Sequence, residues 1–305
     1  MIDFTLLGTA ATMPLPDRAL SAAVLRCGGR TILFDCGEGT QTAARRAHVS
    51  LAKTDLIALT HYHGDHIFGL AGLLQTLNCL GRVEPLYITG PEGLSSALAP
   101  ILALAGETQY EIRLVSGEIK LAELNPAWSA NAVLTPFATN HRVASAGYAF
   151  TLARFPKFLP EKAKALGVPV KYWGKLQRGE SVRTENGEIM PDAVTGGGRK
   201  GLKIVFSGDT APCDELTEGA RGADLLVCDA TYAEDSQLDM AELYGHSTFS
   251  QSARTAKAAG VKRLWLTHYS QMIEKPESYL ENAREIFLFA ECGYDGKTEA
   301  FTFSD

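Results

Sequence analysis

The stretch His61-Tyr62-His63-Gly64-Asp65-His66 places three imidazoles and one carboxylate within six residues. It directly follows the apolar segment 55–60, which reads as a strand, and it precedes a leucine-rich helical pattern over residues 69–80. Burying four such side chains together without a cation is costly, so the stretch predicts a metal site. Ordinary core histidines are the alternative, and the spacing disfavours it.

Further potential ligands follow other apolar, strand-like runs. His141, Asp209 and His268 each stand just past such a run, and loops at strand ends commonly carry functional side chains. Five of the seven histidines belong to this set. Of the other two, His246 lies in a polar loop ahead of a helix, whereas His48 lies in a charged stretch and is expected to be structural or solvated.

Imidazole and carboxylate ligands suit zinc, and two zinc ions about 3.5–4 Å apart can bind a phosphodiester between them. Manganese and iron accept the same ligands, so the residue types leave the metal open.

Short apolar runs alternate with helical patterns along the chain. Strands are predicted over residues 31–34, 56–60, 86–89, 132–135, 203–206, 225–228 and 264–267. Helices are predicted over residues 69–80, 251–259 and 276–290. The alternation indicates an α/β protein, and the early run of short strands favours a layered sandwich over one doubly wound sheet.

Residues 155–201 break this pattern with four prolines and the run Gly196-Gly197-Gly198. The break predicts an insertion that projects from the core, with a linker between two domains as the alternative. Segment 154–203 contains eleven Lys or Arg against five Asp or Glu, a local charge of +6 in a chain of net charge −6. Such a basic segment could bind a polyanion, or it could be a solvated loop region.

The composition of the 305-residue chain, 46% hydrophobic and 21% charged, is that of a globular protein. The sequence opens without a signal-peptide pattern and contains no apolar run of membrane-spanning length, so a soluble, cytoplasmic protein with no membrane association is expected. Its six cysteines form no Cys-x-x-Cys pair, which predicts reduced and mostly buried thiols.

The sequence resembles the metallo-β-lactamase superfamily and, within it, the ribonuclease Z group of tRNA 3′-processing endonucleases. The His-x-His-x-Asp-His stretch is shared by the whole superfamily. The segments that point to the narrower group are Asp35-Cys36-Gly37-Glu38-Gly39-Thr40-Gln41, Gly174-Lys175-Leu176 and His246-Ser247-Thr248. The resemblance covers nearly the whole chain. It implies one four-layer αββα metallo-β-lactamase sandwich over residues 1–305, with a substrate-binding arm inserted at about 152–200.

By position, the resemblance implies two zinc ions per chain. The implied ligands are His61, His63 and His141 for one zinc, Asp65, His66 and His268 for the other, and Asp209 as the bridge. Asp65 is also implied to orient the attacking hydroxide. His246 is implied to protonate the leaving 3′-oxygen, with Asp229 as the carboxylate that orients it, and a helix-capping role is the alternative for His246. Asp35 is expected either to support the ligand loop or to be a turn carboxylate.

The chain departs from the group's pattern in three places. Asp229 stands where the group usually has glutamate, the arm lacks a Gly-Pro pair near Val170-Lys171-Tyr172, and the loop after His268 lacks the usual arginine. The implied substrate is precursor tRNA and the implied assembly is a homodimer. The alternatives are a small-molecule phosphodiesterase or esterase of the same superfamily, and a non-catalytic RNA-binding protein that keeps the fold.

Overall fold

The computed structural model describes residues 1–185 and 187–303. Two compact units are present: the first is Met1–Thr151 with Lys203–Thr302, and the second is Leu152–Leu202 with Phe303. Within the described residues, the helices are too short or too polar to cross a membrane.

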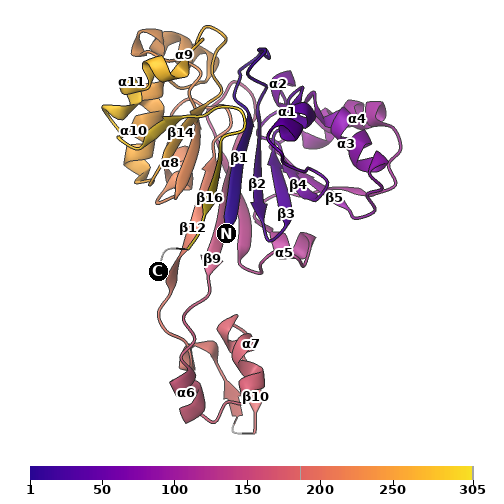
Figure 1. Cartoon of the computed structure of the whole chain (residues 1–305), viewed down its shortest axis with the longest axis vertical. Coiled ribbons are helices and arrows are strands. Elements are labelled where there is room, and N and C mark those ends of the chain that lie inside the picture. The colour runs from indigo at the N-terminus through magenta and orange to yellow at the C-terminus, as the bar shows by residue number, and fades with distance from the viewer. Residues whose placement is uncertain (186, 304–305) are drawn as a thin grey trace. The chain divides into compact units, whose positions relative to one another are not determined.

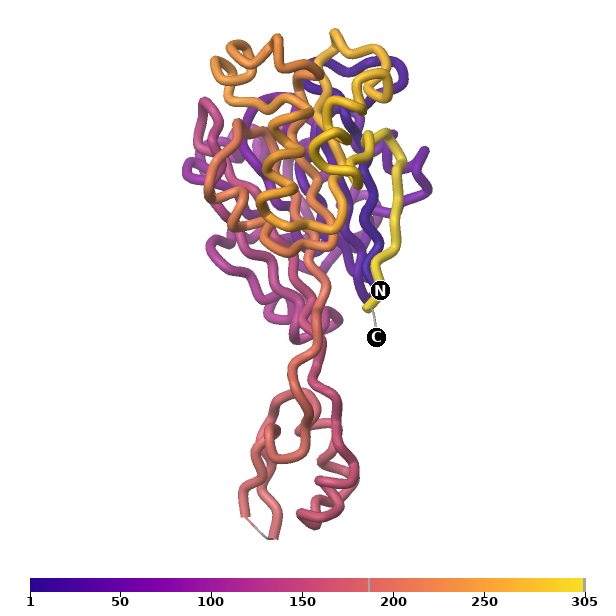
Figure 2. The backbone as a smooth tube through the Cα atoms, turned by 90° about the vertical axis from the view of Figure 1, so that its left-hand side faces the viewer, coloured from indigo at the N-terminus to yellow at the C-terminus, as the bar shows by residue number. Residues whose placement is uncertain are grey.

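The first unit contains two seven-stranded sheets (Figure 1). In spatial order, the strands of the first sheet are β16 (Thr298–Phe301), β1 (Ile2–Gly8), β2 (Ala22–Cys27), β3 (Arg30–Phe34), β4 (Thr54–Ala58), β5 (Leu86–Thr89) and β6 (Ile112–Leu114). Strands β3 to β6 pair in parallel, whereas β1 pairs antiparallel with both β2 and β16. The first and last strands of the chain, β1 and β16, therefore lie side by side, as Figure 2 shows.

The second sheet contains, in spatial order, β15 (Ala290–Cys292), β14 (Leu264–Thr267), β13 (Leu225–Asp229), β12 (Arg199–Phe206), β9 (Ala146–Arg154), β8 (Ala132–Ala138) and β7 (Ile119–Lys120). Strands β12 to β15 are parallel. The residues of β13 and β14 are buried throughout, which is typical of parallel strands covered on both faces.

Aromatic side chains join the two sheets. The ring centroid of Phe4 in the first sheet lies 6.2 Å from that of Trp265 in the second. The ring centroid of Phe34 in the first sheet lies 5.4 Å from that of Phe206 in the second. Tyr148 on β9 lies 6.1 Å from Phe34. Each of these rings is buried, and burial of one such side chain stabilises the fold by roughly 1.5–3 kcal/mol.

Helices cover the outer face of each sheet and complete four layers (Figure 1). The first sheet packs its outer core against α1 (Thr40–Arg46), α3 (Leu70–Cys79) and α4 (Leu94–Ala105). The second packs against α8 (Asp214–Ala220), α10 (Phe249–Ala259) and α11 (Glu281–Arg284). The predicted αββα sandwich is confirmed.

Helix α10 shows how local sequence sets an element's bounds. The Thr248 hydroxyl accepts a hydrogen bond from the amide of Gln251 at 3.2 Å, and the Gln251 side chain accepts one from the amide of Thr248. This reciprocal pair begins the helix. Gly260, with φ +63°, ends it in the left-handed conformation that glycine adopts easily.

The helix predicted over residues 276–290 is wrong. A 3-10 turn, η4 (Pro276–Tyr279), is followed by the single turn of α11, and Ala290 already begins β15. The segment between them contains Phe287 and Phe289, whose rings contact each other at 6.2 Å. Aromatic residues are common in strands, and here they precede one.

The second unit is small. Its elements are α6 (Pro160–Ala165), η1 (Val170–Tyr172), α7 (Trp173–Gln177), β10 (Val182–Thr184), β11 (Gly187–Ile189) and η2 (Pro191–Ala193). They share a minor core in which Trp173 contacts Phe158 at 5.2 Å and donates a hydrogen bond from Nε1 to the carbonyl of Val168 at 2.9 Å. The unit covers the segment that the sequence assigns to an inserted arm, and its role as an arm stays a prediction.

Candidate metal centre

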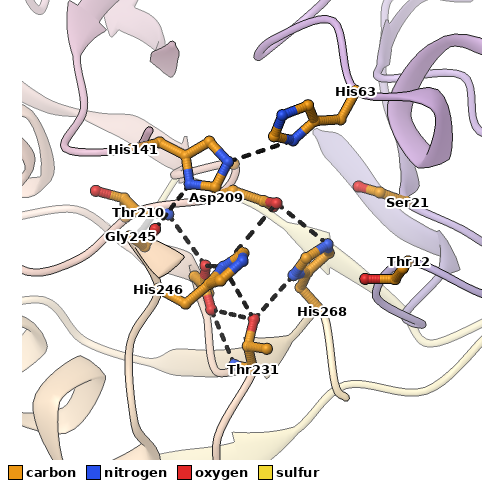
Figure 3. Close-up of polar contacts among 12 residues, drawn as sticks. Thr12, Ser21, His63, His141, Asp209, Thr210, Thr231, Gly245, His246 and His268 are labelled. Carbon is orange, nitrogen blue, oxygen red and sulfur yellow. Dashed lines mark hydrogen bonds and ion pairs between the residues drawn. The ribbon is translucent and has the colours of Figure 1, made fainter. Parts of the chain in front are cut away.

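The predicted ligands come together where strands of both sheets end. Figure 3 labels four of them: His63, His141, Asp209 and His268. His61 follows β4, Asp209 follows β12 and His268 follows β14, each on the C-terminal side of its strand. His141 lies in the loop between β8 and β9. The helix α2 (Gly64–Ile67) carries the other two ligands of the opening stretch, and His63 precedes it.

The first cluster consists of His61, His63 and His141. The distance from His61 Nε2 to His63 Nδ1 is 2.9 Å, and from His141 Nε2 to His63 Nδ1 it is 3.4 Å. Three imidazole nitrogens this close together could bind one shared cation.

The second cluster consists of Asp65, His66 and His268. Asp65 Oδ2 lies 3.6 Å from His66 Nε2 and 3.5 Å from His268 Nε2. Asp209 lies between the two clusters, since its Oδ2 is 3.3 Å from the Nε2 atoms of both His66 and His268 and 3.7 Å from that of His61.

Unpartnered atoms test whether these residues fit a metal. Among the described residues, His66 Nε2, His268 Nε2 and Asp209 Oδ1 are buried and have no hydrogen-bond partner. Buried polar atoms are nearly always paired, and divalent cations take imidazole nitrogen and carboxylate oxygen as ligands. The donor set and its orphaned atoms therefore fit bound divalent metal.

The Nδ1 atoms of three candidate ligands contact polar groups outside the clusters. His141 Nδ1 donates to the carbonyl of Gly245 at 2.8 Å, and His268 Nδ1 lies 3.0 Å from Thr231 Oγ1. His66 Nδ1 lies 2.7 Å from Asp35 Oδ2. These contacts aim each Nε2 at the cluster and fix which nitrogen stays unprotonated.

Asp35 combines the two roles that the sequence left open. Its carboxylate also accepts hydrogen bonds from the amide of Thr60 at 2.7 Å, the Thr60 hydroxyl at 2.9 Å and the Ser21 hydroxyl at 3.3 Å. The side chain is fully buried. It thus supports both His66 and the turn that leads into the ligand stretch.

His246 and Asp229 form a pair beside the second cluster. Asp229 Oδ2 is 2.7 Å from His246 Nδ1, so the shorter carboxylate still reaches the imidazole. Asp229 also accepts hydrogen bonds from the amide of Thr210 at 3.0 Å and from the amide and hydroxyl of Thr231 at 2.9 and 2.8 Å. Thr231 and the amide of Thr12, which donates to Asp65 Oδ2 at 2.8 Å, were not singled out from the sequence.

Burial and charge set the protonation of these groups. Burial, reinforced by the neighbouring imidazoles, lowers the pKa of His61 to about 2 and leaves it neutral at pH 7. Burial alone would raise the pKa of Asp65, but its interaction with His268 holds it below the ordinary value. Burial opposes the charged form of His246, yet the Asp229 carboxylate raises the pKa of that imidazole to about 9.

Strained backbone concentrates at the site. Of the four non-glycine residues with positive φ among those described, three belong to it: Thr12 at +60°, Asp35 at +54° and His268 at +63°. Each such backbone conformation destabilises the fold by roughly 1–3 kcal/mol and persists only where the surrounding structure imposes it. The fourth, His48, is exposed and lies outside the site, as predicted.

A pocket of about 900 Å³ opens over the clusters. Its walls include Asp65, His246 and the exposed ring of Phe68, together with Arg142 and Tyr244. A space of this size admits a small ligand or a nucleotide.

Comparisons with known proteins agree with this architecture. Residues 30–269 match the family model described as a β-lactamase superfamily domain. The chain is 38% identical to a ribonuclease Z of Lachnospira eligens over 100% of this chain and 99% of the relative. It is 40% identical to a ribonuclease Z of Clostridium acetobutylicum, with all of both chains covered. The crystal structure of human tRNase Z, short form, is 28% identical and superposes with a TM-score of 0.69 over 99% of this chain and 100% of that one.

Proposed function

Because this chain belongs to the ribonuclease Z family of the β-lactamase superfamily, we propose that it is an endoribonuclease that removes 3′ trailers from tRNA precursors and leaves a tRNA 3′-hydroxyl. The observation that carries the proposal is the position of Asp209 between two ligand clusters, with the His246 imidazole 4.0 Å from the same carboxylate. This arrangement suits hydrolysis of a phosphodiester, which needs charge neutralisation and a proton for the leaving oxygen.

The fold implies a divalent metal, and we propose two zinc ions per chain. The residues that would hold them are His61, His63 and His141 in one cluster, Asp65, His66 and His268 in the other, and Asp209 in both. When bound, such ions supply water activation at neutral pH and neutralise charge on the phosphoryl oxygens.

The chain's own side chains provide the remaining chemistry. Asp65 stays ionised and is fixed by the amide of Thr12, so it can orient an attacking water by accepting its hydrogen bond. His246 has Nδ1 held by Asp229, which leaves Nε2 to protonate the departing 3′-oxygen. A raised pKa keeps this acid protonated near neutrality.

The test is to incubate the zinc-loaded protein with a precursor tRNA carrying a 3′ trailer and, in parallel, with bis(p-nitrophenyl) phosphate. The proposal expects cleavage at the trailer junction, loss of that cleavage in Asp65→Ala, and a 3′-hydroxyl on the tRNA product. Turnover of the small diester without trailer cleavage would contradict it and favour the small-molecule phosphodiesterase. Binding of the precursor without any turnover would favour the non-catalytic RNA-binding protein.

We also propose that the second unit binds the tRNA body. Its exposed cations include Lys171, Lys175 and Arg183, and phosphate contacts of this kind give salt-dependent affinity. Replacing these three with alanine should raise KM for precursor tRNA and leave hydrolysis of the small diester unchanged. Lys164→Ala is the control, because that ammonium is paired with Glu161 at 3.0 Å. Equal KM values for the triple variant and the control would contradict this role.

Finally, we propose that the protein acts as a homodimer in the cytoplasm, as the family resemblance implies. Light scattering during size-exclusion chromatography should then give about 66 kDa, twice the 32.8 kDa of one chain. A mass near that of one chain would contradict the dimer and leave the activity proposal untouched.

A further inference from the structure

Arg142 stands out among the residues that line the metal pocket. Of the described residues in its wall, Arg142 has the one lysine or arginine side chain, whereas Glu38, Asp65 and Asp209 are acidic. A strand of RNA that places one phosphate at the ligand clusters brings further phosphates close to it. Those phosphates lie beyond the candidate metal ligands and need a positive partner of their own.

The side chain of Arg142 is held in place by the end of α9 (Leu238–Tyr244). Its guanidinium carbon lies 5.0 Å from the ring centroid of Tyr244, the last residue of that helix. The next residue, Gly245, packs closely on His141, since a Cβ atom at Gly245 would lie 3.0 Å from His141 Cα. One packing contact therefore places both the candidate ligand His141 and the cation that follows it.

No hydrogen bond or ion pair joins Arg142 to another residue in the described part of the chain. Arg113 makes a useful contrast: its guanidinium lies 5.9 Å from the ring centroid of Tyr87, but it is also paired with Glu111 at 2.6 Å. A guanidinium stacked on an aromatic face keeps its edge N–H groups free, and that edge matches two phosphate oxygens. The donors of Arg142 are therefore available to a ligand, whereas those of Arg113 are partly used.

We infer that Arg142 binds a phosphodiester of the RNA strand next to the scissile one, and that Tyr244 holds the guanidinium for this contact. The inference rests on the proposed function. It assigns a substrate-binding role to a residue that contacts no candidate metal directly. It also supplies a cation at the proposed cleavage site.

The test measures steady-state cleavage of precursor tRNA by the wild type, Arg142→Ala, Arg142→Lys and the matched control Arg113→Ala. Loss of one charge-assisted contact should raise KM about 10- to 100-fold in Arg142→Ala, with an intermediate rise in Arg142→Lys, which keeps the charge but not the planar fork. The slope of log KM against log salt should fall by about 0.7 to 0.9, as expected for one phosphate. Arg113→Ala should match the wild type in both KM and slope.

Substrates with a single neutral methylphosphonate linkage then locate the contact. A neutral linkage at one position beside the scissile bond should raise KM for the wild type. At that position the wild type and Arg142→Ala should then have equal KM values. Tyr244→Phe should keep the wild-type KM, because the ring remains, and Tyr244→Leu should raise it. If Arg142→Ala folds poorly by thermal melting, Arg142→Lys decides the question.

Two results would overturn the inference: a KM and salt slope of the Arg142 variants equal to those of Arg113→Ala, or a rise in KM that no single neutral linkage removes. Absence of trailer cleavage by the wild type is a different outcome, since it refutes the proposed function on which the inference stands.

Discussion

Replacing Asp229 with asparagine should remove the acid that protonates the leaving oxygen. The Asp229 carboxylate raises the pKa of His246 to about 9 against the opposing effect of burial. At pH 7.5 an imidazole with that pKa is about 97% protonated. Without the Asp229 carboxylate, burial is opposed only by the more distant Asp209, so the pKa of His246 falls and a smaller fraction of the imidazole is protonated at the same pH.

In the proposed mechanism the protonated form of His246 is the active one, so activity is lost as pH rises through its pKa. The alkaline limb of kcat should therefore move to lower pH in Asp229→Asn. At equal metal content, cations bound in the pocket act on both proteins alike, which makes the difference between the limbs the informative quantity. The His246 imidazole also loses the partner that orients it, so kcat at pH 7.5 should fall by roughly 10²- to 10⁴-fold in total.

The assay is the initial rate of trailer cleavage under saturating substrate from pH 5.5 to 9.5, with a substrate whose chemistry limits turnover. Asp229→Glu is the control, because it keeps the charge. An alkaline limb at the same pH in the wild type and in Asp229→Asn would refute the assignment of His246 as the acid. Metal content must be equal in the compared samples.

Three further predictions concern metal and stability. A chelator should lower Tm and added zinc should restore it, and free zinc at a hundredfold excess over its Kd should stabilise the fold by about 2.7 kcal/mol. Asp209→Ala should melt at the same temperature with and without zinc. A Tm increase as large as that of the wild type in this variant would contradict the role of Asp209 as a shared ligand. Asp55→Ala removes a buried carboxylate and leaves its partner Arg30, which is partly buried, with Glu84 as its remaining counter-charge, so urea denaturation should show a loss of about 1–3 kcal/mol, and a change under about 0.5 kcal/mol would contradict a stabilising ion pair. Gly208→Ala should cost about 2–4 kcal/mol, because φ is +62° and the added Cβ would lie 2.6 Å from the Thr60 side chain. Gly29→Ala, with φ +79° and open space around it, should cost only about 1–2 kcal/mol in the same urea experiment, and equal losses would refute the steric argument.

Residue chemistry made the ligand positions predictable, since His61 and Asp209 each follow an apolar run that the structure shows as a buried strand. Strand ends and ligand types are local properties of the sequence. The amide of Thr12 could not be found this way, because every residue offers an amide and only the tertiary fold brings this one to Asp65. Arg142 likewise reads as one surface arginine until the end of α9 is packed against it.

Elements held by local signals were predicted better than those set by tertiary pairing. Helix α10 has a capping pair and a terminal glycine, and its predicted end at residue 259 is the observed one. The segment 276–290 has helical spacing but no comparable stop signal, and its last residues pair with β14 instead. Strand β1 was not predicted as a strand, although it lies between β16 and β2 in the first sheet.

The hydrogen bonds of Asp229 have a consequence for the whole site. An ionised carboxylate can only accept, so the Thr231 proton must point at Asp229 and the hydroxyl oxygen is left to accept from His268 Nδ1. This hydrogen-bond direction leaves His268 Nε2 unprotonated and able to bind a cation, while the same carboxylate accepts a hydrogen bond from Nδ1–H of His246. The Asp229 carboxylate thus sets the protonation of two imidazoles with different proposed roles: His268 donates a lone pair to a cation, and His246 donates a proton. Substitution at this position is therefore expected to disturb cation affinity and acid catalysis together.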